Sequence, residues 1–186
     1  MLIALVRRSW NDPAATSFNS YQIAQSINIR QGETIMRNLK PYAIWILSLY
    51  IAGVFIQSLF FKFTGAPESI FIFSTLRAWS GLSLFEPAGR WVIGSAELVA
   101  SILLFIPRLR VFGAALAIGI MSGAIYFHLF TPLGVNILGD GGELFTLACG
   151  VWISGWIILA LSKDDVRAWA GILMRRSGLA GNLNRI

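Results

Sequence analysis

The sequence predicts an all-α membrane protein: a four-transmembrane-helix bundle with a short interfacial or re-entrant helix between the first and second spans. Three observations predict it. Of the 186 residues, 56% are hydrophobic and only 13% are charged, roughly half the charged share of an ordinary soluble domain. Four long apolar runs lie between residues 41 and 161. Basic residues collect in alternate connections between these runs, as they do in membrane proteins.

The apolar runs each have the length of a membrane-spanning helix. In chain order they are Pro41–Phe61, Ala88–Ile106, Val111–Phe130 and Leu144–Leu161. At about 1.5 Å per residue, helices of this length cross a hydrocarbon core of about 30 Å. A helix of a soluble bundle would keep a polar stripe, whereas these runs are apolar on all sides. We therefore expect four membrane spans.

The segment between the first and second runs is apolar but too short to cross. Its uninterrupted part, Ser69–Ser80, would extend only about 18 Å as a helix. Pro67 and Glu68 suit a helix N-terminus, and Gly81 suits its end. The segment also carries three charged residues, which are Glu68, Arg77 and Glu86. This pattern predicts an interfacial or re-entrant helix.

The basic residues predict the orientation. With four crossings, both tails and the connection after the second span, with Arg108 and Arg110, fall on one side, while the other side holds only Lys62, Arg77 and Arg90. By the positive-inside rule both termini are cytoplasmic. A fifth crossing would put the two basic tails on opposite faces. The expected location is the inner (plasma) membrane of a bacterium.

The ends of the chain differ in character from its centre. Residues 1–35 are polar and are expected to be a disordered leader, or an upstream misreading with Met36 as the true start. Residues 36–163 form the predicted transmembrane domain, and residues 164–186 a basic cytoplasmic tail. In the tail, apolar residues recur at helical spacing: Val166, Trp169, Ala170 and Leu173. They predict a short amphipathic helix on the inner membrane surface; a frayed, solvated tail is the alternative.

Small residues inside the spans predict close helix packing. Ala115, Gly119 and Gly123 form a ladder at four-residue spacing on the third run, and Ala96 and Ala100 do so on the second. Such faces let helices approach closely in lipid.

Several chemistries are excluded by residue counts. The chain has one cysteine, Cys149, and one histidine, His128. An intrachain disulfide and a C-x-x-C site are therefore impossible, and a haem held by two histidines would need a partner chain. The sequence has no metal-ligand spacing and no nucleotide-binding glycine loop. We expect no intrinsic cofactor and no metal site. Topology explains the basic charge, so nucleic acid is not an expected partner.

Ionisable residues in or near lipid are the candidate functional residues, because a charge there is expensive. Lys62, Glu97, His128 and Glu143 come from four different runs and all fall at the outer level of the bilayer. Structural alternatives exist for each: Lys62 can snorkel, Glu97 can pair with Lys62 or Arg90, and Glu143 can start a helix. His128 can be an interfacial histidine without a functional role. We hypothesise that Lys62, Glu97 and His128 line a polar pocket open to the outer side.

Three motifs resemble the DoxX family of small four-span membrane proteins. They are Lys62-Phe-Thr-Gly65 after the first span, Gly94-Ser-Ala-Glu97-Leu98 in the second, and Met121-Ser-Gly-Ala-Ile-Tyr-Phe-His128 in the third. The resemblance covers about residues 40–163 and excludes the loop TPLGVNILGDGGE. It implies a four-helix membrane bundle in which Lys62, Glu97 and His128 fall on recurring polar positions. Some relatives are linked to quinone-dependent oxidoreductases, including a thiosulfate:quinone oxidoreductase, or to membrane redox-defence complexes; others act in receptor assembly.

The resemblance therefore implies a membrane subunit of a quinone-linked oxidoreductase. A quinone would be the bound cofactor, with Lys62 or His128 donating hydrogen bonds and Glu97 relaying protons. Phe61, Phe63 and Trp79, together with Phe60, could wall the quinone ring; the bland alternative, which these residue types favour, is that they are belt and packing residues. Expected partners are the lipid bilayer, a soluble redox protein or a quinone, and a second copy of the chain. The alternative is a non-enzymatic scaffold, an assembly factor or a small-solute transport protein. Whether the chain itself catalyses a reaction is left open.

Overall fold

The computed structural model describes residues 13–176, and this part of the chain is built from helices, without a β-strand. The elements in order are α2 (Pro13–Thr64), α3 (Pro67–Ser80), the 3-10 helix η1 (Ser83–Phe85), α4 (Ala88–Phe105), α5 (Arg110–Phe130), α6 (Glu143–Leu161) and α7 (Lys163–Arg176). Within the described residues, four helices are long and apolar enough to cross a membrane: α2 from Gln25 onward, α4, α5 and α6. The all-helical prediction and the four predicted runs are confirmed at this level.

The chain divides into two compact units, residues 1–43 and 44–186. In the first unit, residues 13–43 are helical and belong to α2, and the described side chains between residues 21 and 39 are exposed. The sequence had suggested a disordered leader here, so the helix from Pro13 is a difference from that expectation. A start at Met36 stays a prediction. Residues 1–12 of the predicted leader and 177–186 of the tail lie outside the described residues.

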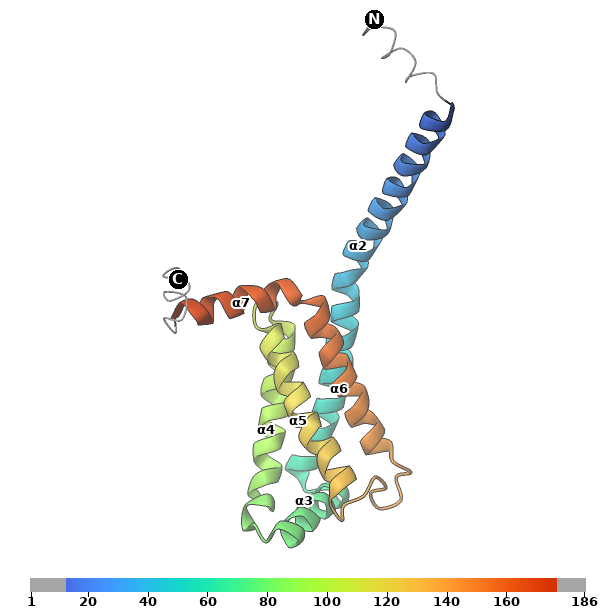
Figure 1. Cartoon of the computed structure of the whole chain (residues 1–186). Coiled ribbons are helices and arrows are strands. Elements are labelled where there is room, and N and C mark those ends of the chain that lie inside the picture. The colour runs from blue at the N-terminus through green and yellow to red at the C-terminus, as the bar shows by residue number, and fades with distance from the viewer. Residues whose placement is uncertain (1–12, 177–186) are drawn as a thin grey trace, which may run out of the picture. The chain divides into compact units, whose positions relative to one another are not determined.

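In the second unit, the part of α2 from Ile44 onward packs with α4, α5 and α6, because its Ile51 and Phe55 belong to the core that these helices share (Figure 1). Helix α5 packs against both α4 and α6. The short connection between α4 and α5 makes these two helices antiparallel neighbours. The core between them is aliphatic with many alanines: Ile51, Phe55, Ala100, Leu104, Ala114, Ala117, Met121, Ala148, Val151 and Ile158.

Two glycines bring the helices into close contact. A Cβ atom added at Gly113 of α5 would lie 2.8 Å from the backbone nitrogen of Leu104 in α4. A Cβ at Gly155 of α6 would lie 2.7 Å from Cγ1 of Ile118 in α5. Because neither position has room for a side chain, glycine is what allows the backbones to approach this closely.

The packed face of α5 is not the predicted one. Ala115 and Gly119 are exposed, and an added Cβ at Gly119 or Gly123 would meet nothing within 4 Å. The ladder expected to pack, Ala115–Gly119–Gly123, is therefore wrong as a helix contact. Four-residue spacing identifies a stripe of small residues but does not say which stripe faces a neighbour. On α4 the prediction holds at Ala100, which is fully buried.

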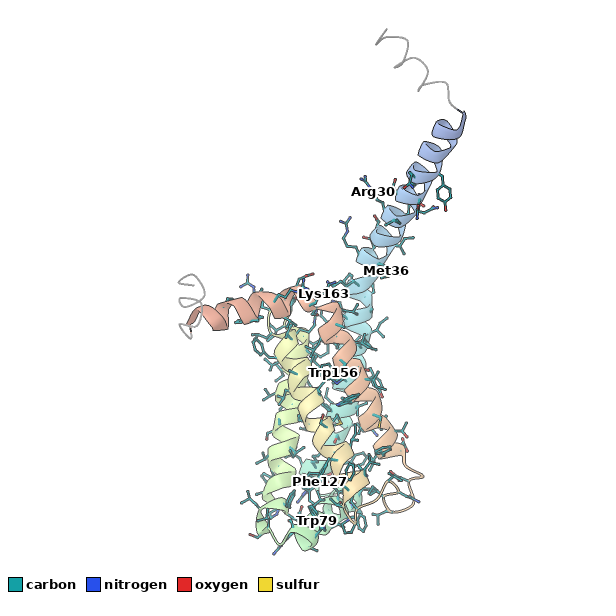
Figure 2. All side chains as sticks on the ribbon, viewed as in Figure 1. Arg30, Met36, Trp79, Phe127, Trp156 and Lys163 are labelled. Atoms are coloured by element: carbon teal, nitrogen blue, oxygen red, sulfur yellow. The ribbon has the colours of Figure 1, made fainter. Side chains whose placement is uncertain are left out.

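The short helix α3 has the predicted ends. Pro67 occupies its first turn, and its C-terminal cap is Gly81, with φ of 71°, whose N–H donates to the carbonyl of Arg77. A residue with a side chain is strained in this left-handed conformation, which explains the glycine. Helix α3 packs against η1 and α4 and lies at one end of the second unit (Figure 1). Trp79 marks this end in Figure 2, and Lys163 marks the opposite end.

The tail forms the helix α7, as predicted, at the end opposite α3 (Figure 1). Its half-buried side includes Val166, Trp169 and Ala170. The indole Nε1 of Trp169 donates to the carbonyl of Arg108 at 3.0 Å, and its ring meets Phe112 edge-on at 5.0 Å. These contacts hold α7 against the turn between α4 and α5.

Candidate functional site

A cavity of about 650 Å³ lies at the α3 end of the second unit. Its walls come from α2, α3, η1, α4, α5, α6 and the loop before α6, and they are mostly apolar. Phe127, one of the wall residues, is seen near this end in Figure 2. The ionisable and hydroxyl side chains of the lining are Ser58, Lys62, Glu68, Ser69, Glu97, His128, Asp140 and Glu143. The structure thus brings Lys62, Glu97 and His128 into the lining of one cavity.

Lys62 and Glu97 form a buried ion pair. The Nζ atom of Lys62 lies 3.0 Å from each carboxylate oxygen of Glu97, and the two side chains are only 13% and 1% exposed. Lys62 Nζ also donates to the hydroxyl of Ser58, which in turn donates to Glu97 Oε1 at 3.4 Å. Glu97 lies about half way along α4, where an isolated carboxylate would be costly. Pairing with Lys62 compensates that cost.

The local sequence explains how the pair forms. Ser58 and Lys62 are one helical turn apart and share a face of α2. Gly94, nearly one turn before Glu97, lets α4 approach α2: its added Cβ would lie 3.2 Å from Phe63 Cε2 and 3.6 Å from Lys62 Cβ. A Cβ at position 94 would crowd the ring of Phe63 and touch the stem of Lys62 at an ordinary contact distance. The glycine of the GSAEL motif therefore lets α4 lie close to the turn of α2 that carries Lys62.

Arg90 is not the partner of Glu97. Its Nη2 and Nε atoms bind Glu86 at 3.0 and 3.2 Å, and its Nη1 donates to the backbone carbonyl of Lys62 at 2.6 Å. The last carbonyls of a helix lack partners within the helix, so Arg90 caps the end of α2. Of the two pairings that the sequence left open for Glu97, the structure has the one with Lys62.

His128 enters the cavity lining from α5 and is 7% exposed. Its Nδ1 lies 2.6 Å from the carbonyl oxygen of Gly134. A carbonyl oxygen only accepts, so Nδ1 carries a proton and, in the neutral ring, Nε2 is the basic nitrogen. Its ring also meets Phe145 edge-on at 5.7 Å. Within residues 13–176, no hydrogen bond joins His128 to Lys62 or Glu97.

The loop before α6 is held by Asp140, a residue to which the sequence analysis gave no role. Its carboxylate accepts the backbone N–H groups of Ile137 at 2.8 Å, Gly142 at 2.9 Å and Leu144 at 3.1 Å. Desolvation would raise the pKa of Asp140, but these three donors and the nearby His128 outweigh it and lower that pKa. An aspartate just before an apolar run is a helix-start signal that could have identified it.

The predicted aromatic wall is only partly correct. Phe61 lines the cavity, whereas Phe63 and Trp79 do not. Phe63 packs against Trp91, with ring centroids 5.9 Å apart. Trp79 is 47% exposed, and Phe60 is 66% exposed. Successive helical residues are about 100° apart, so Phe61 and Phe63 cannot face the same way. The aromatic lining consists of Phe55, Phe61, Phe73, Phe85 and Phe127.

Sequence reasoning also missed Ser69 of α3. Its side chain lines the cavity and is 5% exposed. Its hydroxyl has no hydrogen-bond partner within the part of the chain that the structure describes. No sequence pattern marks this serine, because its burial depends on where α3 lies relative to the other helices.

The site therefore combines an apolar cavity, a buried ion pair, a basic imidazole nitrogen and an unpaired hydroxyl. It can bind a small molecule that is mostly apolar, and Glu97 and His128 can exchange protons with it. The described residues contain no cluster of three or more side chains suited to a metal ion. In comparisons with known proteins, no family model, no curated protein and no solved structure matches this chain.

Proposed function

We propose that this chain is a DoxX-like integral membrane protein and the membrane subunit of a quinone-linked oxidoreductase or redox-defence complex. The observation that carries the proposal is the buried Lys62–Glu97 pair in the wall of an otherwise apolar cavity of about 650 Å³. Ionisable groups among apolar helices are costly and commonly mark a substrate or proton pathway. Cavities of this size accommodate small-molecule ligands and cofactors.

The proposed membrane arrangement follows from the two ends of the second unit. The α2, α4, α5 and α6 helices cross the bilayer, and α3 lies in its outer interface. The α7 end carries basic residues, including Arg108, Lys163 and Arg167, so it faces the cytoplasm together with both termini. The cavity then opens in the outer half of a bacterial inner membrane.

The lining fits a quinone headgroup. When bound, a quinone would take up two electrons from a cofactor of a partner redox protein, and two protons, to become a quinol. The phenylalanines of the lining supply an apolar slot for the ring. Glu97 at its carboxylate and His128 at Nε2 hold and pass protons, and the Lys62 ammonium, bound to both oxygens of Glu97, orients that carboxylate. The chain's own residues thus bind, orient and supply protons, while the electrons come from the partner.

The proposal is tested by identifying what the protein carries. The full-length protein is purified in mild detergent, extracted with organic solvent and analysed by mass spectrometry, and copurifying proteins are identified. We expect a bound quinone and a soluble redox protein. A wild-type preparation with neither would contradict the proposal and favour the scaffold or transport alternative.

A cavity-filling variant makes the test specific. Gly123 lines the cavity and has nothing within 4 Å of an added Cβ, so Gly123→Leu should fill the space and reduce the bound quinone by at least about tenfold, because the leucine occupies the volume of the ring. Gly53 of α2 is a matched control, since it is equally open but lies outside the lining. Gly53→Leu should retain the quinone. Equal quinone content in both variants would place the quinone elsewhere.

A further inference from the structure

Ser69 is a buried hydroxyl without a partner at the start of α3. Other serines of this protein donate to a carbonyl of the preceding helical turn, as Ser101 does to Glu97 at 2.8 Å and Ser154 to Gly150 at 2.7 Å. Ser69 is the third residue of α3, so the residue four positions earlier, Gly65, precedes the helix. The hydroxyl therefore lacks the usual intrahelical acceptor, and it is buried and unpaired in a residue that lines the cavity.

The other buried donors of the cavity lining are already engaged. The Lys62 ammonium has three protons, and it contacts both oxygens of Glu97 and the hydroxyl of Ser58. The Nδ1–H of His128 is bound to Gly134. Among the buried side chains of the described lining, Ser69 thus keeps a free O–H for a ligand. A buried polar group of this kind usually has a partner.

The charges of the lining limit what that ligand can be. Carboxylates outnumber basic groups: Lys62 neutralises Glu97, while Glu68, Asp140 and Glu143 face the cavity together with a single histidine. An anionic ligand would be repelled. The apolar walls disfavour a compact polar solute. An uncharged amphiphile with a hydrogen-bond acceptor satisfies both conditions.

We infer that Ser69 is a ligand-binding residue, whose hydroxyl donates a hydrogen bond to the carbonyl oxygen of an uncharged amphiphile in the cavity. This inference rests on the proposed function in that a quinone is one member of this class. It goes further by replacing the expected donors, Lys62 and His128, with a residue that the sequence did not indicate. It also predicts selection against anionic molecules of the same size.

The test measures binding of three probes to the full-length protein in lipid nanodiscs by calorimetry. The probes are decylubiquinone, the neutral ketone 2-undecanone and the anion decanoate. We expect both neutral probes to bind and decanoate to bind more weakly. Ser69→Ala should weaken the neutral probes by roughly three- to tenfold, the value of one hydrogen bond, and Ser69→Thr should restore binding. Ser74→Ala is the matched control, because Ser74 is exposed on the same helix and bonds its own backbone at Phe71.

Thermal unfolding of the ligand-free protein distinguishes a ligand-binding role of Ser69 from a structural one. Removing an unpaired buried hydroxyl should raise the thermal midpoint of ligand-free Ser69→Ala, whereas a structural serine would lower it. Unchanged affinities in Ser69→Ala would overturn the inference while leaving the proposed function intact. Binding of 2-undecanone but not decylubiquinone, with loss in Ser69→Ala, would support the inference and contradict the proposed function. Preference for decanoate, or binding of no neutral probe, would overturn the inference.

Discussion

The two halves of the helix bundle use glycine on α5 in opposite ways. In the half nearer α7, which we call the packed half, Gly113 brings α5 so close to α4 that an added Cβ would lie 2.9 Å from the carbonyl oxygen of Ala100. In the half nearer α3, the hollow half, Gly123 has open space around it and lines the cavity. One glycine allows contact between backbones, and the other leaves volume for a ligand.

The difference shows that a glycine in an apolar helix has no fixed structural role. Its role depends on which element packs opposite it. At the packed half, Gly113 of α5 lies against α4, and Gly155 of α6 lies against Ile118 of α5. At the hollow half, α3 and η1 pack against α4, and the buried charges are found there. The packed half supplies rigidity, and the hollow half can then tolerate a cavity and an ion pair that do not maximise stability.

The largest expected effect comes from breaking the ion pair of the hollow half. Glu97→Leu leaves the Lys62 ammonium buried without a counter-charge and should lower the free energy of unfolding by about 3–5 kcal/mol. The double variant Lys62→Met/Glu97→Leu removes both charges and should be more stable than Glu97→Leu. Unfolding in detergent micelles measures both. If the losses of Glu97→Leu and of Lys62→Met add up to the loss of the double variant, the two charges are not coupled.

The glycine comparison comes next in size. Gly113→Leu introduces a side chain against the backbone of α4 and should cost about 1–3 kcal/mol or more, because the helices must separate. Gly123→Leu should leave the unfolding midpoint unchanged or slightly raised, since the side chain enters open space. The same micelle unfolding assay compares them. Equal losses in both variants would mean that the two halves are packed alike.

A smaller effect distinguishes two unpaired serines. Ser48 of α2 is fully buried and, like Ser69, has no hydrogen-bond partner among the described residues, but it does not line the cavity. Ser48→Ala should stabilise the protein by about 1 kcal/mol and leave the binding of decylubiquinone unchanged. Ser154→Ala, which loses a hydrogen bond to Gly150, is the control and should not stabilise. Weaker binding of decylubiquinone to Ser48→Ala would contradict the prediction that serines outside the cavity lining do not affect the ligand.

The smallest effect concerns acid sensitivity of the loop over the hollow half. The pKa of Asp140 is lowered from its ordinary 3.8 by its backbone donors. Its contribution to stability is therefore complete above that ordinary value and is lost as the pH falls through the lower folded-state pKa. From about pH 5 downward, the wild-type thermal midpoint should fall more steeply than that of Asp140→Asn. Parallel curves would mean that this carboxylate does not hold the loop.

Sequence reasoning went furthest where hydrophobicity alone decides. It predicted the second span as Ala88–Ile106, and the structure has α4 at Ala88–Phe105. It also singled out Glu97, since a charge deep in an apolar run is conspicuous at any rotation of the helix. Lys62 and His128 were found for the same reason. The resemblance to the DoxX family and the functions that it implies remain proposals.

Tertiary structure decided everything that depends on which way a helix faces its neighbours. The sequence left Glu97 with two possible cations, and the approach of α4 to α2 at Gly94 selected Lys62. It could not tell that Gly113 packs while Gly123 lines a cavity, or that Phe61 faces inward and Phe63 does not. Composition and run length determine that these helices suit a membrane. The contacts between helices depend on rotation and approach, which are set jointly by residues far apart in the chain.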